Sequence, residues 1–348
     1  MNLFEETNGE SVFKNELALN SDFEPKELPG RENELKEMAL ILSPVLQAKK
    51  TRTLFLHGPP GTGKTSSINY LLKELSEHSS KIKCLKVNCW NNYTKAAVLS
   101  ELAQQVGAGM PRRGLANDEI FNRLIEIITK SKENTVIFLD EVDRLSFKKE
   151  ENVLYELARS QEIKAIILAT NYSEFLTSLD NRIRSSLNPE STSFNKYSPA
   201  QLKNILRERS ALAFKKNACS EEAIALSAAN AAKNNGDARL AISLLLQAGR
   251  NADARQSKKV EDEDVRKAIE KNENPSKEKK LVNLKETEQK IISLLKEKGE
   301  ATAGEVYENI SLGERAGRNY LQILEAKGLI ERITTTKGRG RTTVLKLK

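Results

Sequence analysis

The fold of this chain is decided by the stretch GPPGTGKT at residues 58–65, which fits the phosphate-binding pattern G-x-x-x-x-G-K-[ST] in full. An apolar run typical of a strand precedes it and a helical pattern follows it, which is the context that the motif requires. The glycines let backbone N–H groups curl around phosphate oxygens, and the N-terminus of the following helix adds positive potential. A glycine-rich turn with no ligand is the alternative, and it does not account for motif and context together.

The sequence therefore predicts ATP or ADP at this turn. Lys64 is expected to reach the β- and γ-phosphates, and the Thr65 hydroxyl is expected to bind Mg²⁺. The predicted nucleotide-binding residues of this stretch are Gly58, Pro59, Pro60, Gly61, Thr62, Gly63, Lys64, Thr65 and Ser66.

Short apolar runs predict buried strands at residues 53–57, 83–88, 135–140 and 164–170, with a less apolar fifth strand at 193–195. Helical patterns separate them, and another helix is expected at 31–47. Strands that alternate with helices indicate a mostly parallel sheet in an α/β domain. We expect this P-loop domain to span residues 31–197, after an N-terminal extension, residues 1–30, that is polar and rich in turn residues.

Two acids end the third predicted strand, in the run TVIFLDE at residues 135–141. Asp140 is placed to hold Mg²⁺, and Glu141 is placed to polarise the attacking water. Asn171 follows the next strand, where its amide can orient that water or contact the γ-phosphate. Arginines in LDNRIRSSL (residues 179–187) and GDAR (residues 236–239) can stabilise charge that develops on the transferring phosphoryl group.

The rest of the chain is expected to form two further domains. Residues 198–270 contain only helical patterns, with Ser198 and Gln201 forming a capping box and Asp237 as a second N-cap, and they predict a small helical lid. Residues 271–282 have the composition of a linker. Residues 283–348 show three helical patterns followed by a β-ribbon, which is the order of elements in a winged helix-turn-helix. Predicted capping boxes at residues 302–305 and 311–314 start the second and third of these helices.

The charge of the chain favours an anionic partner. The formal net charge of the 348 residues is +8, and the last 18 residues hold six cations and one acid. No apolar stretch has the length that crosses a bilayer, so a membrane is not an expected partner. Three cysteines form no disulfide framework or metal-site spacing, which favours a reducing, cytoplasmic location.

Several of these stretches together resemble one family. LDEVDRL, ATNY, LDNRIRSSL, NNGDARLAISLL and the opening FEPKELPGRENEL, followed by a winged helix, are similar to the archaeal origin-recognition/cell division control initiators of the AAA+ superfamily. The resemblance runs from about residue 13 to residue 348. It implies an ATP-dependent initiator of DNA replication that binds double-stranded origin DNA and recruits or loads an MCM-type replicative helicase, with weak, switch-like ATP hydrolysis.

The resemblance also implies roles for single residues. The strand before Asn171 would lie between the strands that lead to the P-loop and to Asp140, and Arg239 would reach from the lid to the γ-phosphate. Arg182 would act as a finger on the nucleotide of a neighbouring subunit, with Arg184 as the alternative, and the chain would thus self-associate. The adenine pocket would be lined by residues around 25–31 and by Tyr197, which adds Leu28, Arg31 and Tyr197 to the expected ATP-binding residues.

Two DNA contacts are implied in the same way. The helix at about 314–327 would enter the major groove through Arg315, Arg318 and Asn319, and the wing would lie along a minor groove or backbone through Lys337, Arg339 and Arg341. A solvated hairpin tip is the alternative for the wing. Arg112 and Arg113 resemble a second DNA contact of the family, and a plain exposed loop explains them equally well.

Three other functions remain open at this point. A clamp-loader small subunit shares the ATPase motifs, but this chain has Ile183-Arg184-Ser185 where the Ser-Arg-Cys finger motif of that class is expected. A branch-migration helicase also ends in a winged helix. A transcriptional regulator with a nucleotide-sensing P-loop domain is the alternative from a different functional class.

Overall fold

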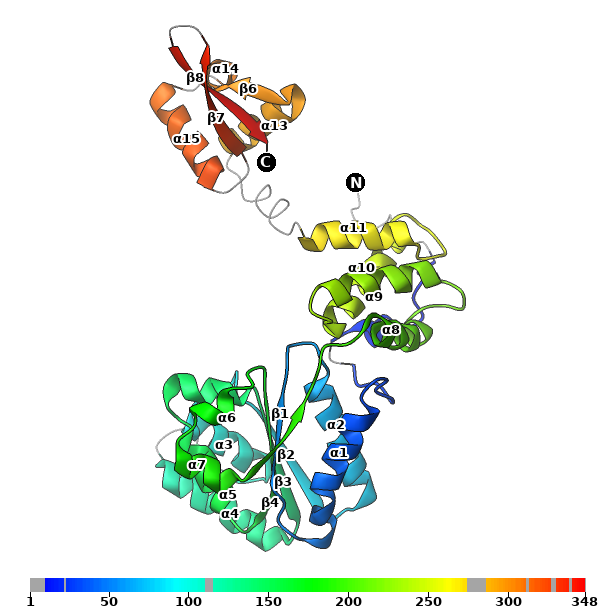
Figure 1. Cartoon of the computed structure of the whole chain (residues 1–348), viewed down its shortest axis with the longest axis vertical. Helices are drawn as coiled ribbons and strands as arrows, with labels where there is room; N and C mark the ends of the chain where they lie inside the picture. Colours follow the sequence, from blue (N-terminus) through cyan, green and yellow to red (C-terminus); the bar gives the residue numbers. More distant parts are fainter. Residues whose placement is uncertain are drawn as a thin grey trace. The chain divides into compact units, whose positions relative to one another are not determined.

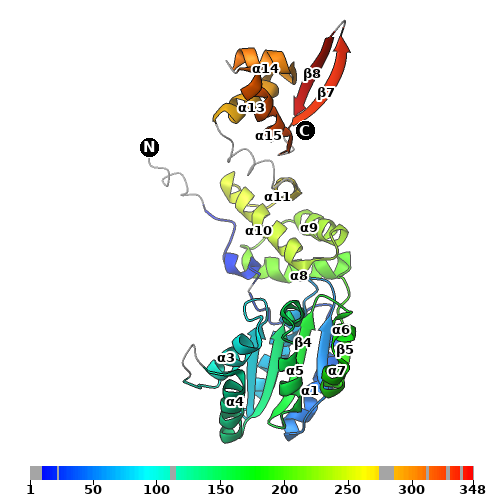
Figure 2. The ribbon, with the colours of Figure 1, turned by 90° about the vertical axis from the view of Figure 1, so that its left-hand side faces the viewer.

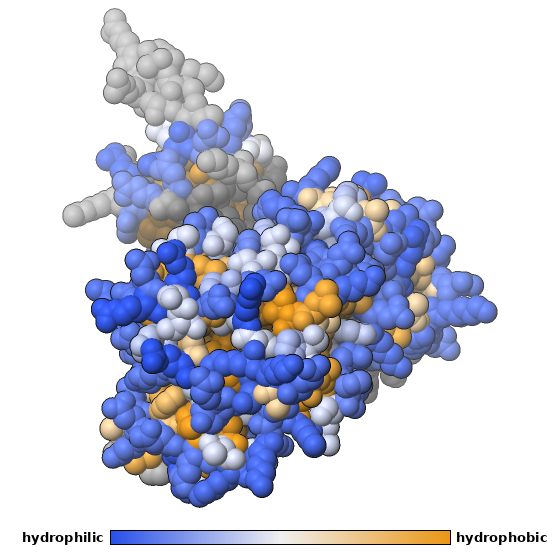
Figure 3. Space-filling model, turned by 60° about the horizontal axis from the view of Figure 1, so that its bottom comes forward, coloured by the Kyte–Doolittle hydropathy of each residue, from blue (hydrophilic) through white to orange (hydrophobic). Residues whose placement is uncertain are grey.

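The computed structural model describes residues 10–21, 23–109, 115–273, 286–310, 313–326, 330–337 and 340–347. The chain divides into two compact units, Met1–Ala268 and Ile269–Lys348. The face shown in Figure 3 is mostly hydrophilic, with small apolar areas, which agrees with the high content of charged residues. Among the described helices, none combines the length and the hydropathy that a membrane span requires.

A parallel sheet forms the centre of the first unit (Figure 1). Its strands are β1 (Thr53–His57), β2 (Ile82–Asn88), β3 (Asn134–Asp140), β4 (Ile163–Thr170) and β5 (Pro189–Ser193), in the order β2-β3-β4-β1-β5. The first four confirm the predicted strands to within one residue at either end. As the resemblance implied, β4 lies between β3 and β1. Strands buried on both faces read as continuous apolar runs, which is why the sequence located them.

The fifth strand is the one that the sequence misplaced. It was predicted at 193–195, whereas β5 occupies Pro189–Ser193. This strand lies at the edge of the sheet, and its sequence, PESTS, buries only Thr192. Edge strands tolerate proline and polar residues because one side of the strand faces away from the ladder, so the apolar signal is missing.

Helices cover both faces of the sheet, with a separate core on each side. On one face, α1 (Glu32–Leu42) and α2 (Lys64–His78) bury Met38, Leu42, Ile68 and Leu72. The other face is covered by α3 (Lys95–Gln105), α4 (Asn117–Ser131), α5 (Asn152–Arg159), α6 (Phe175–Ser178) and α7 (Asn181–Leu187). The helix predicted at 31–47 changes at Ser43 into the 3₁₀-helix η3 (Ser43–Gln47), because Pro44 cannot continue the α-helical hydrogen bonding. A further 3₁₀-helix, η4 (Val142–Lys148), follows β3.

The lid consists of α8 (Pro199–Ala213), α9 (Glu221–Lys233), α10 (Ala238–Ala254) and α11 (Asp262–Glu273). Ser198 and Gln201 form the predicted capping box, and the Asp237 side chain caps α10 as predicted. The expected end of the lid at 270 falls inside α11. Residues 274–282 of the expected linker lie outside the described part of the chain.

The N-terminal extension is not a loose tail over its described part. It contains the 3₁₀-helix η2 (Glu16–Leu19), which lies beside α8 and α10 of the lid (Figure 2). Ala18 and Leu19 are fully buried there. No sequence pattern predicts this packing, because a short polar segment with scattered apolar residues has no helical or strand period.

The second unit has the predicted order of elements. Its helices are α13 (Glu286–Lys298), α14 (Ala303–Asn309) and α15 (Glu314–Ala326), and its ribbon is β7 (Ile330–Lys337) with β8 (Gly340–Leu347). A short strand, β6 (Glu300–Thr302), also pairs with β8 and was not predicted. Thr302 and Glu305 form the predicted capping box of α14, whereas Ser311, in the second predicted box, lies outside the described residues. Ile291, Leu295, Leu321 and Leu345 belong to its core.

Candidate nucleotide-binding site

The P-loop connects β1 to α2 at the carboxyl edge of the sheet. Gly63 has φ of +88°, in the left-handed region, and a Cβ there would lie 2.6 Å from the Tyr197 hydroxyl oxygen. Only glycine fits both the backbone conformation and the space. The turn therefore delivers the first residues of α2 to a cavity lined by residues 60–66, so that their backbone N–H groups are available to an anion.

Lys64 lies inside this turn and is almost fully buried. Its Nζ donates to the carbonyl oxygens of Gly58 and Pro59 at 2.7 and 2.9 Å, and to Asn171 Oδ1 at 2.9 Å. Burial lowers the pKa of Lys64 to about 8, against a smaller opposing effect of the Asp140 carboxylate. The ammonium group is thus held by neutral oxygens in a site where an added negative charge would stabilise it.

Asp140 and Thr65 meet beside this lysine. Thr65 Oγ1 donates to Asp140 Oδ2 at 2.8 Å. Burial is the main cause that raises the pKa of Asp140, and hydrogen bonds from Thr65 and from the Glu141 backbone oppose it only in part. A hydroxyl and a buried carboxylate whose charge is incompletely compensated are oxygen ligands that suit Mg²⁺. Groups of three or more acidic, histidine or cysteine ligands are absent among the described residues, so the rest of a metal shell would come from water or phosphate.

Glu141 has φ of +53° and ψ of +42°, which is the left-handed conformation in a residue other than glycine. Such backbone strain is retained where the surrounding structure imposes it, and it is common at functional sites. Burial raises the pKa of Glu141, and the neighbouring Asp140 charge adds to the effect, while Arg144 opposes it. Both carboxylates line the same cavity as Lys64.

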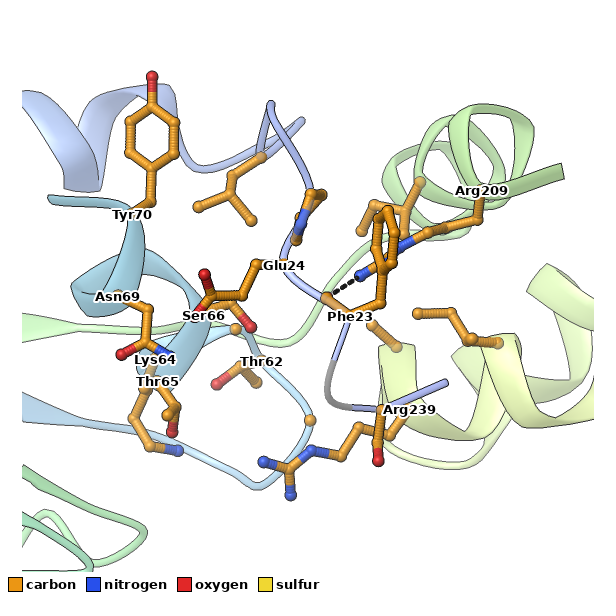
Figure 4. Close-up of a pocket in the computed structure, with 18 of the residues that line it drawn as sticks. Phe23, Glu24, Thr62, Lys64, Thr65, Ser66, Asn69, Tyr70, Arg209 and Arg239 are labelled. Carbon is orange, nitrogen blue, oxygen red and sulfur yellow. Dashed lines mark hydrogen bonds between the residues drawn. The ribbon is translucent and has the colours of Figure 1, made fainter. Parts of the chain in front are cut away.

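The lid adds a cation from the other side. Arg239 lies in the first turn of α10, where Asp237 Oδ1 accepts from the backbone N–H groups of Arg239 and Leu240 at 2.8 and 3.3 Å. Its side chain lines the cavity and extends from α10 toward the P-loop (Figure 4). The charge of Arg239 lowers the pKa of Lys64, Asp140 and Glu141, which places it within electrostatic reach of all three.

The cavity has a volume of about 910 Å³ and continues beyond these polar groups. The predicted residues Leu28 and Tyr197 line it, together with residues that the sequence analysis missed. These are chiefly Phe23 of the N-terminal extension and Ile205, Arg209, Ile242 and Leu246 of the lid. A motif search could not find them, because they belong to no local pattern and meet only in the folded chain.

Arg31 was predicted to bind the nucleotide, but it is not among the described residues that line the cavity. It contacts the backbone of the P-loop instead. Its Nε donates to the Thr62 carbonyl at 2.9 Å, and an Nη donates to the Asn195 carbonyl at 2.6 Å. The guanidinium lies 4.0 Å from the centre of the Tyr197 ring and pairs with Glu34. Arg31 thus holds the shape of the P-loop and does not reach toward a nucleotide from this position.

The two candidate finger residues lie elsewhere. Arg182 and Arg184 are on α7, and neither is among the described residues that line the cavity of their own chain. The Arg182 side chain is 88% exposed, with Nε 3.8 Å from Asp180, while Arg184 donates to Asn181 Oδ1 at 3.1 Å. An exposed position is required of a group that acts on another subunit, so the finger role stays a prediction.

All but two of the predicted DNA contacts fall in the second unit. Arg318 and Asn319 are exposed on α15, where Gly317 allows the Tyr307 ring of α14 to approach closely. Arg315 lies on α15 and Lys337 ends β7. Arg341 is on β8, where it lies opposite Thr336 of β7. Arg112, Arg113 and Arg339 lie outside the described residues.

Comparisons with known proteins fit this arrangement. A family model described as "AAA domain" matches residues 47–178, and one described as "Cdc6 AAA+ ATPase-type lid domain" matches residues 203–270. The chain is 34% identical to the ORC1-type DNA replication protein 1 of Methanothermobacter thermautotrophicus over 370 residues, covering 100% of this chain and 97% of the relative. The chain belongs to the ORC1-type family of DNA replication proteins.

Other relatives agree with this assignment. The ORC1-type DNA replication protein 1 of Archaeoglobus fulgidus is 32% identical, covering 100% of this chain and 91% of that protein. The structure of the Aeropyrum pernix ORC1 protein in complex with DNA matches with a TM-score of 0.71 at 30% identity, covering 97% of this chain and 94% of that one. This ORC1-type chain is therefore an AAA+ ATPase of the replication initiators, which sets aside the clamp-loader, branch-migration and transcriptional alternatives.

Proposed function

We propose that this chain is a replication initiator switched by ATP, which holds ATP with Mg²⁺ in the cavity described above and binds double-stranded origin DNA through its winged helix. One observation carries the nucleotide part of the proposal. Lys64, Asp140 and Asn171 meet at the carboxyl ends of three adjacent strands, and Arg239 of the lid lines the same cavity. Crevices at the carboxyl ends of parallel strands are where α/β proteins bind ligands.

Each residue of the site has its own role at the phosphates of the bound ATP. Lys64 exchanges the carbonyls of Gly58 and Pro59 for phosphate oxygens, which compensate its buried charge better than neutral carbonyls do. Thr65 and Asp140 would hold Mg²⁺, which supplies positive charge at the phosphates. Glu141 orients the attacking water, and Asn171, already bonded to Lys64, fixes that side of the site. Arg239 stabilises the charge on the transferring group and makes the lid sensitive to it.

A substitution separates binding from hydrolysis. Glu141→Gln removes the carboxylate while keeping the shape of the side chain, so ATP binding should be retained within about twofold and hydrolysis should be lost. ATP titration and phosphate release measure the two quantities. Equal loss of both would show that Glu141 supports the binding site and does not act on water.

The winged helix supports the DNA part of the proposal. Arg318 and Asn319 are exposed on the second helix of a helix-turn-helix, and the ribbon that follows has a strong excess of cations. Cations along a ribbon neutralise phosphates without reading sequence, whereas the helix is placed to contact base edges. The Aeropyrum pernix relative was solved in complex with DNA, which is further support. We extend the proposal to recruitment of an MCM-type replicative helicase at the bound origin, and to a location at the nucleoid.

Genome-wide mapping of the bound protein tests the origin role. An initiator should occupy repeated sites beside replication start sites, and the occupancy should change in a Lys64→Ala strain that does not bind ATP. Occupancy at promoters, with no relation to replication start sites, would overturn the origin role. Loss of helicase recruitment at occupied origins on depletion of this protein would support the helicase step, and unchanged recruitment would exclude it.

A further inference from the structure

The segment of residues 11–25, called here the strap, is attached to the lid. Lys14 and Asn15 donate their backbone N–H groups to the Ala213 carbonyl at 2.8 and 3.0 Å, and Lys215 donates to the Val12 carbonyl at 2.9 Å. Val12, Ala18 and Leu19 are buried, with at most 1% exposure. These contacts connect the strap to α8, which begins 174 residues after the end of the strap at Pro25 and therefore gave no local sequence signal.

The Phe13 ring packs on the lid against Phe214 and Gly249, and this packing site is called here the Phe13 seat. The ring stacks on Phe214 with centroids 4.9 Å apart, and it lies directly over Gly249 of α10. A Cβ on Gly249 would come within 2.2 Å of the Phe13 ring, so any other residue there would displace the ring. Beside this seat, Asp253 accepts from the backbone N–H of Val12 and from Ser11 Oγ, both at 2.7 Å.

Arg209 of α8 makes a second connection, close to the nucleotide cavity. Its guanidinium donates to the carbonyls of Ala18 and Phe23 at 3.0 and 3.1 Å, and it lies 4.7 Å from the centre of the Phe23 ring. Figure 4 shows the bond to Phe23 and the two side chains side by side. The Arg209 residue is 7% exposed, and a buried guanidinium needs such acceptors. Arg209 therefore fixes where the Phe23 backbone and ring stand.

The strap reaches the cavity at Phe23, whose side chain lies beside Arg209 and apart from Lys64 and Thr65 (Figure 4). Residues 23–29 line the cavity, and the Gln201 amide of the lid donates to the Gly30 carbonyl at 3.3 Å, which holds the segment after them. The lining also includes the apolar side chains of Leu28, Ile205, Ile242 and Leu246. An apolar subsite beside a phosphate site suits the base and ribose of a nucleotide.

We propose that the strap is a wall of the nucleoside subsite that belongs mechanically to the lid, and that Arg209 is a positioning residue that sets this wall through Phe23. The inference rests on the proposed nucleotide-binding function and adds to it. Arg239 connects the lid to the phosphates, and the strap connects the lid to the nucleoside. Binding of a complete nucleotide would therefore fix the lid at two points, whereas a polyphosphate would fix it at one.

The test compares ligands that share phosphates but differ in the nucleoside. Arg209→Met keeps the apolar stem and removes the donors, and its affinities for ATP and for inorganic tripolyphosphate are measured on the full chain by displacement of a fluorescent nucleotide. We expect ATP affinity to fall about tenfold and tripolyphosphate affinity to stay within twofold. Arg209→Lys, which keeps the charge and a donor, should recover part of the loss. Equal losses for the two ligands, or no loss for ATP, would overturn the proposal.

A second variant acts from outside the cavity. Gly249→Ala removes the seat of Phe13 without touching a lining residue, so it should show the same selective loss of ATP affinity. Gly304→Ala on α14, where no described atom lies within 4 Å of the added methyl, is the matched control and should bind both ligands as the wild type does. Unchanged ATP affinity in a folded Gly249→Ala protein would show that the strap does not contribute. If the wild type binds neither ligand, the proposed nucleotide function itself fails, which is a separate outcome.

Discussion

Ala238, the first residue of α10, donates its backbone N–H to the carbonyl of Gly61 in the P-loop at 3.1 Å. The lid and the P-loop are thus in direct contact at the entrance of the phosphate site. Asp237 packs against the same glycine, since a Cβ on Gly61 would lie 1.8 Å from Asp237 Oδ1. These two contacts connect the P-loop to the start of α10, which carries Arg239.

Gly61→Ala should disrupt this contact. The residue has φ of +72°, which alanine adopts at a cost of about 1–2 kcal/mol, and the added methyl would also collide with the Asp237 carboxylate. We expect ATP affinity to fall more than about tenfold, which corresponds to about 1.4 kcal/mol or more of binding free energy. Isothermal titration measures it.

Gly107→Ala separates the cost of the backbone conformation from the collision with Asp237. Gly107 has φ of +80°, but no described atom lies within 4 Å of an added Cβ. This variant should lose only the backbone cost in stability and keep its ATP affinity. If both variants lost ATP affinity equally, contact between lid and P-loop would not be the reason.

Nucleotide binding should depend on pH through Lys64. The pKa of about 8 in the free protein means that the side chain loses its proton above that pH, while a bound phosphate would raise the pKa again. ATP affinity should therefore fall by up to about tenfold for each pH unit above 8, and binding at pH 8.5 should take up a proton. Titrations in two buffers of different ionisation enthalpy measure this uptake. Lys64 also affects the free energy of unfolding of the free protein. Between about pH 8 and 10.5 the unfolded chain keeps the Lys64 proton that the folded chain has lost, so the stability of the fold rises with pH in this range.

Lys64→Arg provides the control, because arginine stays protonated throughout this range. Its ATP affinity should be lower than that of the wild type, but it should not change with pH between pH 8 and 9.5. A slope that persists in this variant would assign the pH dependence to another group.

The elements that the sequence located well are those whose signal is local. Strands β1, β3 and β4 are apolar over nearly their whole length, and the P-loop and the Asp140–Glu141 pair follow such strands directly. The caps of α8, α10 and α14 were found because a cap and the groups that it bonds lie within four residues of one another. The position of β4 between β1 and β3 came from the resemblance to a family, since strand pairing is not encoded in any one stretch.

The features that were missed depend on contacts between distant residues. Arg31 follows Gly30 in the sequence, but its partners Thr62 and Asn195 are 31 and 164 positions away. The strap has no periodic pattern, and its burial follows from Gly249 and Arg209 on the lid. Strand β5 carries polar residues because it is an edge strand. These outcomes follow from tertiary packing, which single-sequence patterns do not record.

Arg31→Met should destabilise the first unit strongly. The variant leaves the carbonyls of Thr62 and Asn195 without their donor in a buried place, and the loss should be about 3 kcal/mol in the free energy of unfolding. Urea denaturation measures it. Arg52→Met is the matched control, because Arg52 forms an exposed pair with Glu190 at 3.3 Å and should change stability by less than about 1 kcal/mol. Similar losses in both variants would contradict the role given to Arg31.

Arg341→Ala tests the wing. If Arg341 contacts one phosphate, duplex affinity should fall and the slope of log K against log salt should decrease by about 0.9. Fluorescence anisotropy at several salt concentrations measures both. Lys346, on the same strand, is already paired with Glu300 at 2.7 Å, so Lys346→Ala should change the slope much less. An unchanged slope in Arg341→Ala would remove this residue from the DNA interface.

Arg182 can be tested by mixing two inactive variants. Lys64→Ala cannot hold ATP but carries an intact Arg182, whereas Arg182→Ala holds ATP but lacks the finger. Because the exposed Arg182 lies outside the described lining of its own cavity, hydrolysis should be absent in each variant alone and return in the mixture, provided that neighbouring chains associate. Phosphate release measures this. Arg184→Ala, two residues further along α7, should hydrolyse ATP alone if Arg182 is the finger. Wild-type rates in Arg182→Ala, together with loss in Arg184→Ala, would transfer the role to Arg184.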